Sequence, residues 1–316
     1  MADRLPLPLS LSELEDIRLS ARRRLETTGT GSIIRRRMGQ SLEYREHRRY
    51  VQGDDPRHID WRASARLGRP NHYLVRAYEA EEQFNLLIAV DLRDTMRLPA
   101  PVTKLQFALW VLEALAHISR QQKIKVAFTP LYASTDRWRG FSQGGGIRGA
   151  VERALDEFWR PEAPNQGEAL NAAAAAKALP QASATILITD LYAQDAPSLI
   201  SWAGHACRGY RQVILCELDT WPAERRLLEG QMVRLADVGV TSAPIGEFEP
   251  DAAQLDEAAA RIDQCRTDFG RHIARMRGIV TRWTSPEILT QETAAVAFRQ
   301  WFRIFIRDSE LFARRT

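Results

Sequence analysis

The chain has 316 residues, of which 45% are hydrophobic and 27% charged, a composition typical of globular proteins and one that argues against disorder over most of the length. Its apolar runs, such as residues 86–90, are far shorter than the roughly 20 residues that span a bilayer, and no signal peptide is expected. Three cysteines without a C-x-x-C pair argue against a disulfide scaffold or a zinc ribbon and favour a cytoplasmic protein.

The net charge of +4 is unevenly distributed along the chain. Residues 1–80 hold 16 arginines and 11 acidic residues, a balance of +5, which leaves −1 for the remainder. Arginine supplies 40 of the 44 basic residues. This bias is typical of a GC-rich genome, but arginine is also suited to bidentate binding of carboxylates and phosphates. Composition alone does not locate a charged patch.

The first 82 residues are predicted to form a helix followed by a loop-rich arm. Residues 10–28 begin with serines that suit a helix cap, continue with acidic residues and end with arginines, as the helix dipole favours. Residues 33–80 contain many arginines and two turn signals, at 53–56 and 67–70. This segment is too polar to bury a core of its own, so we expect an arm with short strands.

A different pattern begins at Phe84. Short apolar runs alternate with amphipathic segments, which predicts an α/β domain over residues 83–250 whose mostly parallel sheet has helices on both faces. The expected strands are 84–90, 123–130, 184–189 and 212–218, with one or two short edge strands within 231–248. The expected helices are 103–121, 147–158, 168–179 and 196–206.

Residues 251–316 are predicted to be a helical extension packed on the α/β domain. Apolar residues recur three, four or seven positions apart in 251–276, and four aromatic residues lie close to one stripe of 289–306. Stripes of this kind usually face a core. Both helices are therefore expected to pack on the domain.

Two of the expected strands end at an acidic residue, Asp91 and Asp190. In an open parallel sheet, ligands bind beyond the carboxyl ends of the strands, where the strand order reverses. Alternate residues of the turn after the first strand (Asp91, Arg93 and Thr95) are expected to converge there with Asp190. Hard oxygen ligands at this place would suit Mg²⁺. In the alternative, the acids accept hydrogen bonds from backbone N–H groups at a capped helix start.

The segment before this domain resembles a known family signature. It runs from Arg49-Tyr50 through Gly53-Asp54-Asp55-Pro56-Arg57-His58-Ile59-Asp60-Trp61-Arg62 to Ala65-Arg66-Leu67-Gly68-Arg69-Pro70, and it is similar to the signature of the domain of unknown function family number 58. The resemblance implies a von Willebrand factor A-type (vWA) domain with a Rossmann-type sheet that starts near Phe84. It also implies no known enzymatic activity and an operon partnership with MoxR-type AAA+ ATPases.

vWA domains often hold a metal through D-x-S-x-S, a loop threonine and a later aspartate, the metal-ion-dependent adhesion site. By this resemblance Asp91 and Thr95 match the motif, and Asp190 stands for the later aspartate. Arg93 replaces the first serine, and residues 165–170 offer no threonine. Because the guanidinium supplies positive charge and repels a cation, we expect a degenerate, metal-free site, with Mg²⁺ disfavoured and Arg93 paired with Asp91, Asp94 or Asp190.

The signature turn itself has several interpretations. In the first, Pro56 fixes a turn, acidic side chains cap backbone N–H groups and pair with arginines, and Trp61 anchors the arm on the domain. In the second, the ordered turn is a docking surface, and the two interpretations are compatible. The residues concerned are Asp54, Asp55, Arg57, Asp60, Trp61 and Arg62.

Two further functions are weighed against these. A metal-dependent hydrolase would use Asp54, Asp55, His58 and Asp60, but the usual further histidine or glutamate ligands are missing from the sequence around them. Nucleic-acid binding would use the basic pairs 36–37 and 48–49 with the tyrosines beside them, but acidic residues are interspersed.

The resemblance, together with the lack of a convincing catalytic set in the sequence, implies a non-catalytic adaptor of vWA type that binds proteins and works with a MoxR-type AAA+ ATPase on a client. We expect partners to dock near the crevice formed by Asp91 and Asp190, where Arg93 receives a partner carboxylate as a charge-assisted pair. In the alternative, Arg93 is fully engaged by Asp91 and Asp190.

Overall fold

A computed structural model of the protein describes residues 4–19, 42–50, 56, 59–66, 73–80, 84–133, 138–160, 170–172, 174–192, 196–208, 211–235, 246–309 and 311–314. The chain divides into two compact units. The larger unit comprises Met1–Arg23 and Phe84–Thr316, and the smaller comprises Arg24–Gln83.

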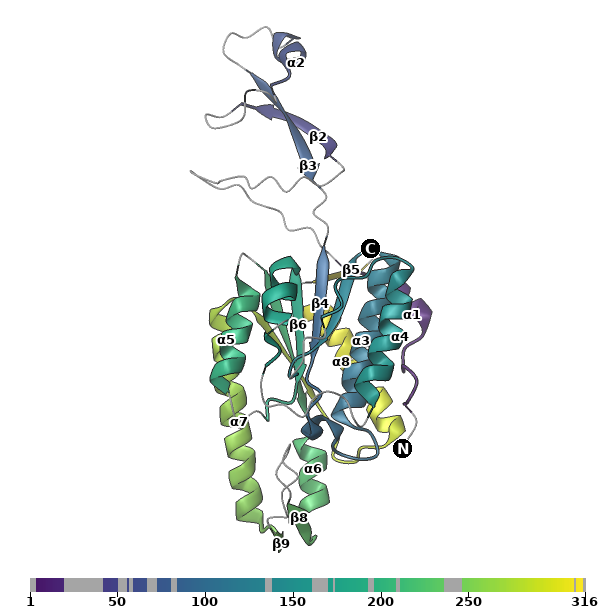
Figure 1. Ribbon diagram of the computed structural model, residues 1–316, viewed down its shortest axis with the longest axis vertical. Helices are drawn as coiled ribbons and strands as arrows, with labels where there is room; N and C mark the ends of the chain where they lie inside the picture. The colour runs from purple at the N-terminus through teal and green to yellow at the C-terminus, as the bar shows by residue number, and fades with distance from the viewer. Residues whose placement is uncertain are drawn as a thin grey trace. The chain divides into compact units, whose positions relative to one another are not determined.

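A five-stranded sheet forms the centre of the larger unit (Figure 1). Its strand order is β10-β7-β6-β4-β5, and every neighbouring pair is parallel. The predicted α/β class, a Rossmann-like parallel sheet flanked by helices, is therefore confirmed. The strands are β4 (Asn85–Val90), β5 (Lys125–Pro130), β6 (Ala184–Thr189), β7 (Gln212–Asp219) and β10 (Ile279–Thr284).

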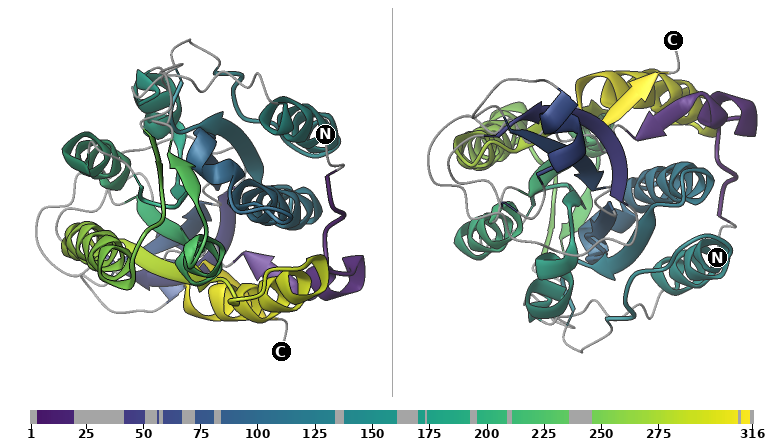
Figure 2. Two further views of the ribbon diagram at one scale, coloured as in Figure 1. Left: turned by 90° about the horizontal axis from the view of Figure 1, so that it is seen from below. Right: turned by 90° about the horizontal axis from the view of Figure 1, so that it is seen from above.

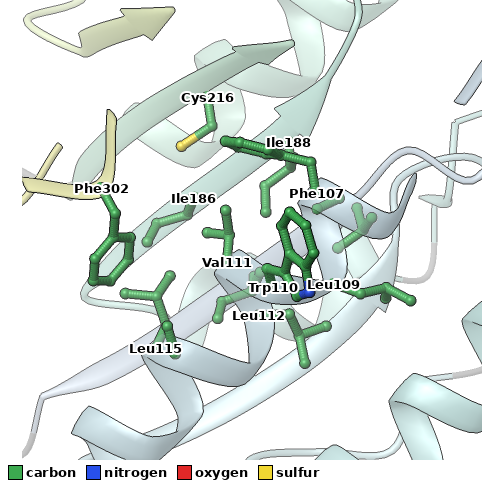
Figure 3. Close-up of a cluster of buried hydrophobic side chains, with 14 of the residues drawn as sticks. Phe107, Leu109, Trp110, Val111, Leu112, Leu115, Ile186, Ile188, Cys216 and Phe302 are labelled. Atoms are coloured by element: carbon green, nitrogen blue, oxygen red, sulfur yellow. The ribbon is translucent and has the colours of Figure 1, made fainter. Parts of the chain in front are cut away.

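Helices cover both faces of this sheet (Figure 2). Successive residues of a strand point to opposite faces, so Ile88 packs into one apolar cluster and Leu87 into the other. Figure 3 shows side chains of α3 (Lys104–Gln121), including Val111, beside Ile186 of β6. The Ile88 face is covered by α3 (Lys104–Gln121), α4 (Gly146–Trp159) and α8 (Gln291–Asp308), and the Leu87 face by α5 (Ala196–Cys207) and α7 (Ala252–Arg275).

One edge of the sheet is β10, a strand that periodicity did not predict. It pairs with β7 along its whole length and buries Trp283. Four of its six residues are β-branched, a composition that favours strands. The predicted edge strands within 231–248 instead form a separate antiparallel pair, β8 (Val233–Leu235) and β9 (Gly246–Phe248).

The N-terminal helix is much shorter than the predicted 10–28. Ser10, one of the predicted capping serines, forms a capping box with Glu13, but α1 spans only Leu11–Glu15. It ends there because the following residues form β1 (Ile17–Leu19), which pairs antiparallel with β11 (Phe312–Arg314) at the other end of the chain. Residues 20–28 lie outside the described residues.

The division into units differs from the predicted boundaries at 82 and 250. Leu14 lies in the same apolar cluster as α3, and the backbone of Leu5 hydrogen bonds with the Gln106 side chain. The N-terminal segment therefore belongs with the α/β sheet, as β10 does. The smaller unit contains β2 (Leu42–Arg49), α2 (Trp61–Arg66) and β3 (Leu74–Ala80), and β2 and β3 are antiparallel.

The remaining elements are short. They are η2 (Asp94–Arg97), η3 (Ala174–Ala178), η4 (Leu179–Gln181) and α6 (Trp221–Leu228). The predicted helix 168–179 is represented by η3 and the start of η4, and residues 168, 169 and 173 lie outside the described residues. None of the helices in the described part of the chain has the length and apolar character that a membrane crossing requires.

Replacing Trp283 with alanine should test how strongly β10 is held. The Trp283 ring stacks on Phe107 with ring centroids 3.9 Å apart, so Trp283→Ala should lower the free energy of unfolding by about 3–5 kcal/mol. Val280→Ala on the same strand, at a side chain that is 39% exposed, is the control and should change it by less than about 1 kcal/mol. Urea unfolding measures both, and equal effects would contradict the packing role of Trp283.

Candidate functional site

The strand order reverses between β4 and β6. The chain goes from β4 to its neighbour β5, at one edge of the sheet. The later strands β6, β7 and β10 all lie on the opposite side of β4 in the strand order. The residues that follow β4 and β6 are Asp91 and Asp190, and both are fully buried. The carboxyl edge of the sheet at this switch point, where parallel sheets bind ligands and where the sequence predicts a crevice, therefore contains two buried carboxylates.

Arg93 closes onto Asp91 with a forked ion pair. Its Nη2 lies 2.6 Å from Oδ2 of Asp91, and its Nε lies 3.0 Å from Oδ1. Nη2 also lies 3.6 Å from Oδ1 of Asp190. The guanidinium carbon is 4.3 Å from the centre of the Tyr132 ring, a cation–π contact. Arg93 thus joins the two carboxylates and is oriented by an aromatic face.

A second cation, Lys104, approaches Asp190 from α3. Its ammonium lies 3.0 Å from Oδ2 of Asp190 and 2.9 Å from Oε1 of Glu224, at the start of α6. Lys104 is only 1% exposed. It also lies 4.2 Å from the centre of the Tyr192 ring. One buried amine therefore connects two carboxylates that are far apart in sequence.

The turn that carries Asp190 is tightly constrained. Leu191 adopts a left-handed backbone conformation, with φ of 59°, which is costly for a residue with a β-carbon. The backbone N–H groups of Leu191 and Tyr192 donate to the Thr189 hydroxyl and to Oδ1 of Asp190. The Thr189 hydroxyl in turn donates to Oδ2 of Asp91 at 2.8 Å. These bonds hold the two carboxylates in one arrangement.

The electrostatics favour ionised groups. Burial raises the pKa of Asp190, but the charges of Lys104 and Arg93 outweigh it, so this pKa lies below its ordinary value. Burial lowers the pKa of Arg93, yet the hydrogen bonds to Asp91 raise it above its ordinary value. Burial, with the charge of Glu224, raises the pKa of Tyr192, which stays a neutral phenol.

The charged cluster continues through Tyr192 to a second buried group. The guanidinium of Arg266 on α7 lies 5.6 Å from the Tyr192 ring centre. Arg266 pairs with Glu217 at 2.9 Å and with Asp219 at 2.8 Å, both on β7. Arg282 of β10 also pairs with Glu217 at 2.9 Å. Burial raises the pKa of Glu217 above its ordinary value in spite of these two arginines.

Two polar atoms near Asp91 bear on what the site can still bind, because neither makes a hydrogen bond to another described residue. One is the hydroxyl oxygen of Thr95, which is buried. The other is Nη1 of Arg93, since the bonds of this guanidinium are made by Nε and Nη2. The Arg93 side chain is 13% exposed. The terminal NH2 group at Nη1 of this fixed arginine therefore keeps donor capacity to spare.

The signature turn lies in the smaller unit and is partly described. Asp54, Asp55, Arg57 and His58 lie outside the described residues, as do residues 36–37 and 165–169. Asp60 caps α2 by accepting from the Ala63 N–H at 3.0 Å, and its other oxygen lies 3.1 Å from Nε2 of His47. Trp61 is 62% exposed and its ring contacts Tyr73 of the same unit; its anchoring of the arm on the α/β domain stays a prediction.

The sequence did not reveal the partners of the two aspartates. Lys104 could have been recognised as unusual from the sequence, since a lysine in the first turn of a helix opposes the helix dipole and lysine is rare in this chain. Asp219 repeats the pattern of a strand that ends at an acid. No sequence pattern marks Glu224 and Arg266 as site residues, because nothing local distinguishes them from other charged helix residues.

Comparison with known families agrees with this picture. A family model described as protein of unknown function DUF58 matches residues 46–239, more than half of the chain. The chain belongs to the DUF58 family. No match was found among curated proteins or among solved structures. The DUF58 match covers the signature turn and the switch point, whereas Arg266 and Arg282 lie beyond it.

Asp190→Asn should show how much the buried ion pair stabilises this DUF58 protein. At pH 7 the change leaves Lys104 with one buried carboxylate fewer, and the free energy of unfolding should fall by about 3–5 kcal/mol. The native pKa of Asp190 is depressed, so its contribution is complete above the unfolded pKa of about 3.9 and is lost as the pH falls through the native value.

The difference between parent and Asp190→Asn should therefore shrink in acid, as measured by thermal unfolding from pH 7 downward. Asp94→Asn, at an exposed acid just after β4, is the control and should change stability by less than about 0.5 kcal/mol. A difference that stays constant over the whole pH range would contradict an ionised Asp190.

Proposed function

We propose that this DUF58 protein is a non-catalytic protein-interaction module of vWA type. It acts in the cytoplasm as an adaptor, together with a MoxR-type AAA+ ATPase, in the assembly or remodelling of a client protein. The observation that carries the proposal is the switch-point crevice, in which both carboxylates are neutralised by fixed cations while Nη1 of Arg93 keeps donor capacity.

The crevice supports binding better than acid–base catalysis. A general base works best when its pKa lies near the operating pH, whereas the pKa of Asp190 lies below its ordinary value and that of Tyr192 above it. Forked pairs such as that of Arg93 with Asp91 fix geometry rather than exchange protons. An anchored guanidinium of this kind is suited to recognising a carboxylate on another protein.

We also propose that the crevice works without a metal. A divalent cation at Asp91, Thr95 and Asp190 would have to displace Nη2 of Arg93, 2.6 Å from Asp91, and would approach Lys104, 3.0 Å from Asp190. Two like charges this close repel the cation strongly in a buried setting. In this proposal Arg93 takes the electrostatic role that Mg²⁺ has in metal-bearing vWA domains.

Calorimetric titration with Mg²⁺ and Mn²⁺ should show no specific binding heat for the parent protein. Arg93→Ser removes the charge nearest Asp91 and supplies the hydroxyl of the D-x-S-x-S pattern, so weak binding should appear in this variant. Arg148→Glu, at an exposed residue on α4, is the control and should resemble the parent. One ion bound to the parent with sub-millimolar affinity would overturn the metal-free proposal.

The docking proposal predicts that a MoxR-type ATPase encoded in the same gene cluster co-purifies with this protein. EDTA should leave the complex intact, and added salt should weaken it because its contacts are ionic. Arg93→Glu should reduce the recovered ATPase at least about tenfold, since a carboxylate then faces the partner carboxylate, whereas Arg148→Glu should not.

Arg93→Glu also places a third acid beside Asp91 and Asp190, so its melting temperature is measured on the same sample. Arg93→Lys keeps the charge and loses the fork, and should give intermediate recovery with a smaller loss of stability. If Arg93→Glu is folded and binds normally, the crevice is not the docking site.

A further inference from the structure

Three aromatic side chains of the smaller unit form a surface that the proposed function does not use. Trp61, at the first residue of α2, is 62% exposed, and Tyr73, just before β3, is 38% exposed. Their rings pack edge to face with centroids 5.6 Å apart. Tyr50, just after β2, meets Tyr73 in the same way at 6.5 Å. We call Tyr50, Trp61 and Tyr73 the aromatic face.

The aromatic face is held by backbone and capping bonds rather than by burial of its rings. The Tyr50 N–H donates to the Tyr73 carbonyl, and the Asp60 N–H donates to the Leu74 carbonyl, both at 2.8 Å. The Ser64 hydroxyl donates to the Asp60 carbonyl at 2.7 Å and accepts from the Leu74 N–H at 2.8 Å. These bonds fix the start of α2 against β3, so the face is ordered before anything binds.

Such an arrangement is unusual for a ring that only stabilises its own fold. Tryptophan is highly buried on average, and Trp61 would gain most of its stabilising effect by burial. Tyrosine, tryptophan and arginine are enriched among the residues that dominate protein–protein binding energy, and aromatic side chains lose little conformational entropy when they bind. The exposure of Trp61 on an ordered scaffold is therefore the property expected of a recognition residue.

The charged residues beside the aromatic face indicate which charge a binding partner would carry. Arg62 and Arg66 on α2 are exposed, and neither has an ion-pair partner among the described residues. The smaller unit, residues 24–83, holds twelve arginines, no lysine and nine acidic residues, a balance of +3. Arginine pairs with carboxylates in a forked geometry and also stacks on aromatic rings. A partner that meets the face would supply carboxylates.

We propose that the aromatic face with Arg62 and Arg66 is a docking surface for an acidic segment of a partner protein. An aliphatic or aromatic side chain of that segment packs on Trp61 and Tyr73, and its carboxylates pair with the two arginines. This surface lies in the smaller unit, and the proposal does not depend on the switch-point crevice.

A protein segment fits the face better than single-stranded nucleic acid does. Nucleic-acid grooves combine stacking rings with a continuous positive track for the phosphates. Here nine carboxylates are spread among the twelve arginines of the unit, and Asp60 directly precedes Trp61. Phosphates would meet those acids, whereas a short acidic segment needs only the two arginines of α2.

Fluorescence anisotropy of the full chain with labelled synthetic probes tests the proposal. The probes are a short glutamate–leucine peptide, a glutamate–serine peptide of the same charge, a lysine–leucine peptide and an oligothymidine. The glutamate–leucine peptide should bind most tightly, because it alone offers both the apolar contact and the carboxylates. Binding of oligothymidine more tightly than this peptide, with a steep salt dependence, would overturn the choice of a protein partner.

Variants assign the binding to the face. Trp61→Ser should weaken the glutamate–leucine peptide at least about tenfold without lowering the melting temperature, because the ring buries little. Phe248→Ser, at an aromatic residue of the larger unit that is 38% exposed, is its control and should bind normally.

The charge contribution is tested separately, so that the proposal stays falsifiable even if Trp61→Ser fails to fold. The double variant Arg62→Glu with Arg66→Glu keeps the aromatic face and should lose the glutamate–leucine peptide while gaining the lysine–leucine peptide. The matched double variant Arg148→Glu with Arg261→Glu, at exposed residues of α4 and α7, should do neither. No binding by the parent, or equal losses in the control variants, would refute the docking surface.

Discussion

The buried contact between Lys104 and Asp190 is the constraint on which the switch point depends. An ammonium in the first turn of α3 is repelled by the helix dipole, and its burial removes it from water at a cost of several kcal/mol. Asp190 and Glu224 offset both effects at 3.0 and 2.9 Å. Asp190 follows β6, and Glu224 lies in the first turn of α6. The contacts of Lys104 therefore hold the start of α3 against the end of β6 and the start of α6.

Tyr192 connects this contact to the rest of the buried charge. Its ring contacts both Lys104 and Arg266, at 4.2 and 5.6 Å from the ring centre, and its hydroxyl donates to Glu224 at 3.3 Å. The site thus has two clusters of carboxylates, one after β4 and β6 and the other on β7. A neutral aromatic ring connects the cations that pair with these two clusters. These contacts hold the switch point in one arrangement, which would lower the entropy lost on binding of the partner that we propose.

Sequence patterns predicted the features that depend on residues close together in the chain. Apolar runs located β4 and β6, and the acids that follow them converged at the switch point because parallel strands share a carboxyl edge. The partners of those acids were not predictable, since Glu224 lies 120 residues from Lys104 and nothing in its own helix marks it. β10 was missed because it is half exposed and lacks the continuous apolar run of the inner strands.

The edge strand β10 has a consequence for where this protein can be cut. The family match ends at residue 239, yet the sheet is completed by residues 279–284. A fragment that stopped at the end of the match would leave β7, whose residues are almost all buried, as an open sheet edge. Its unpaired N–H and C=O groups would form a template for pairing between molecules, and Glu217 would lose both neutralising arginines. The homologous module is therefore smaller than the folding unit, and aggregation is the expected fate of a chain trimmed to it.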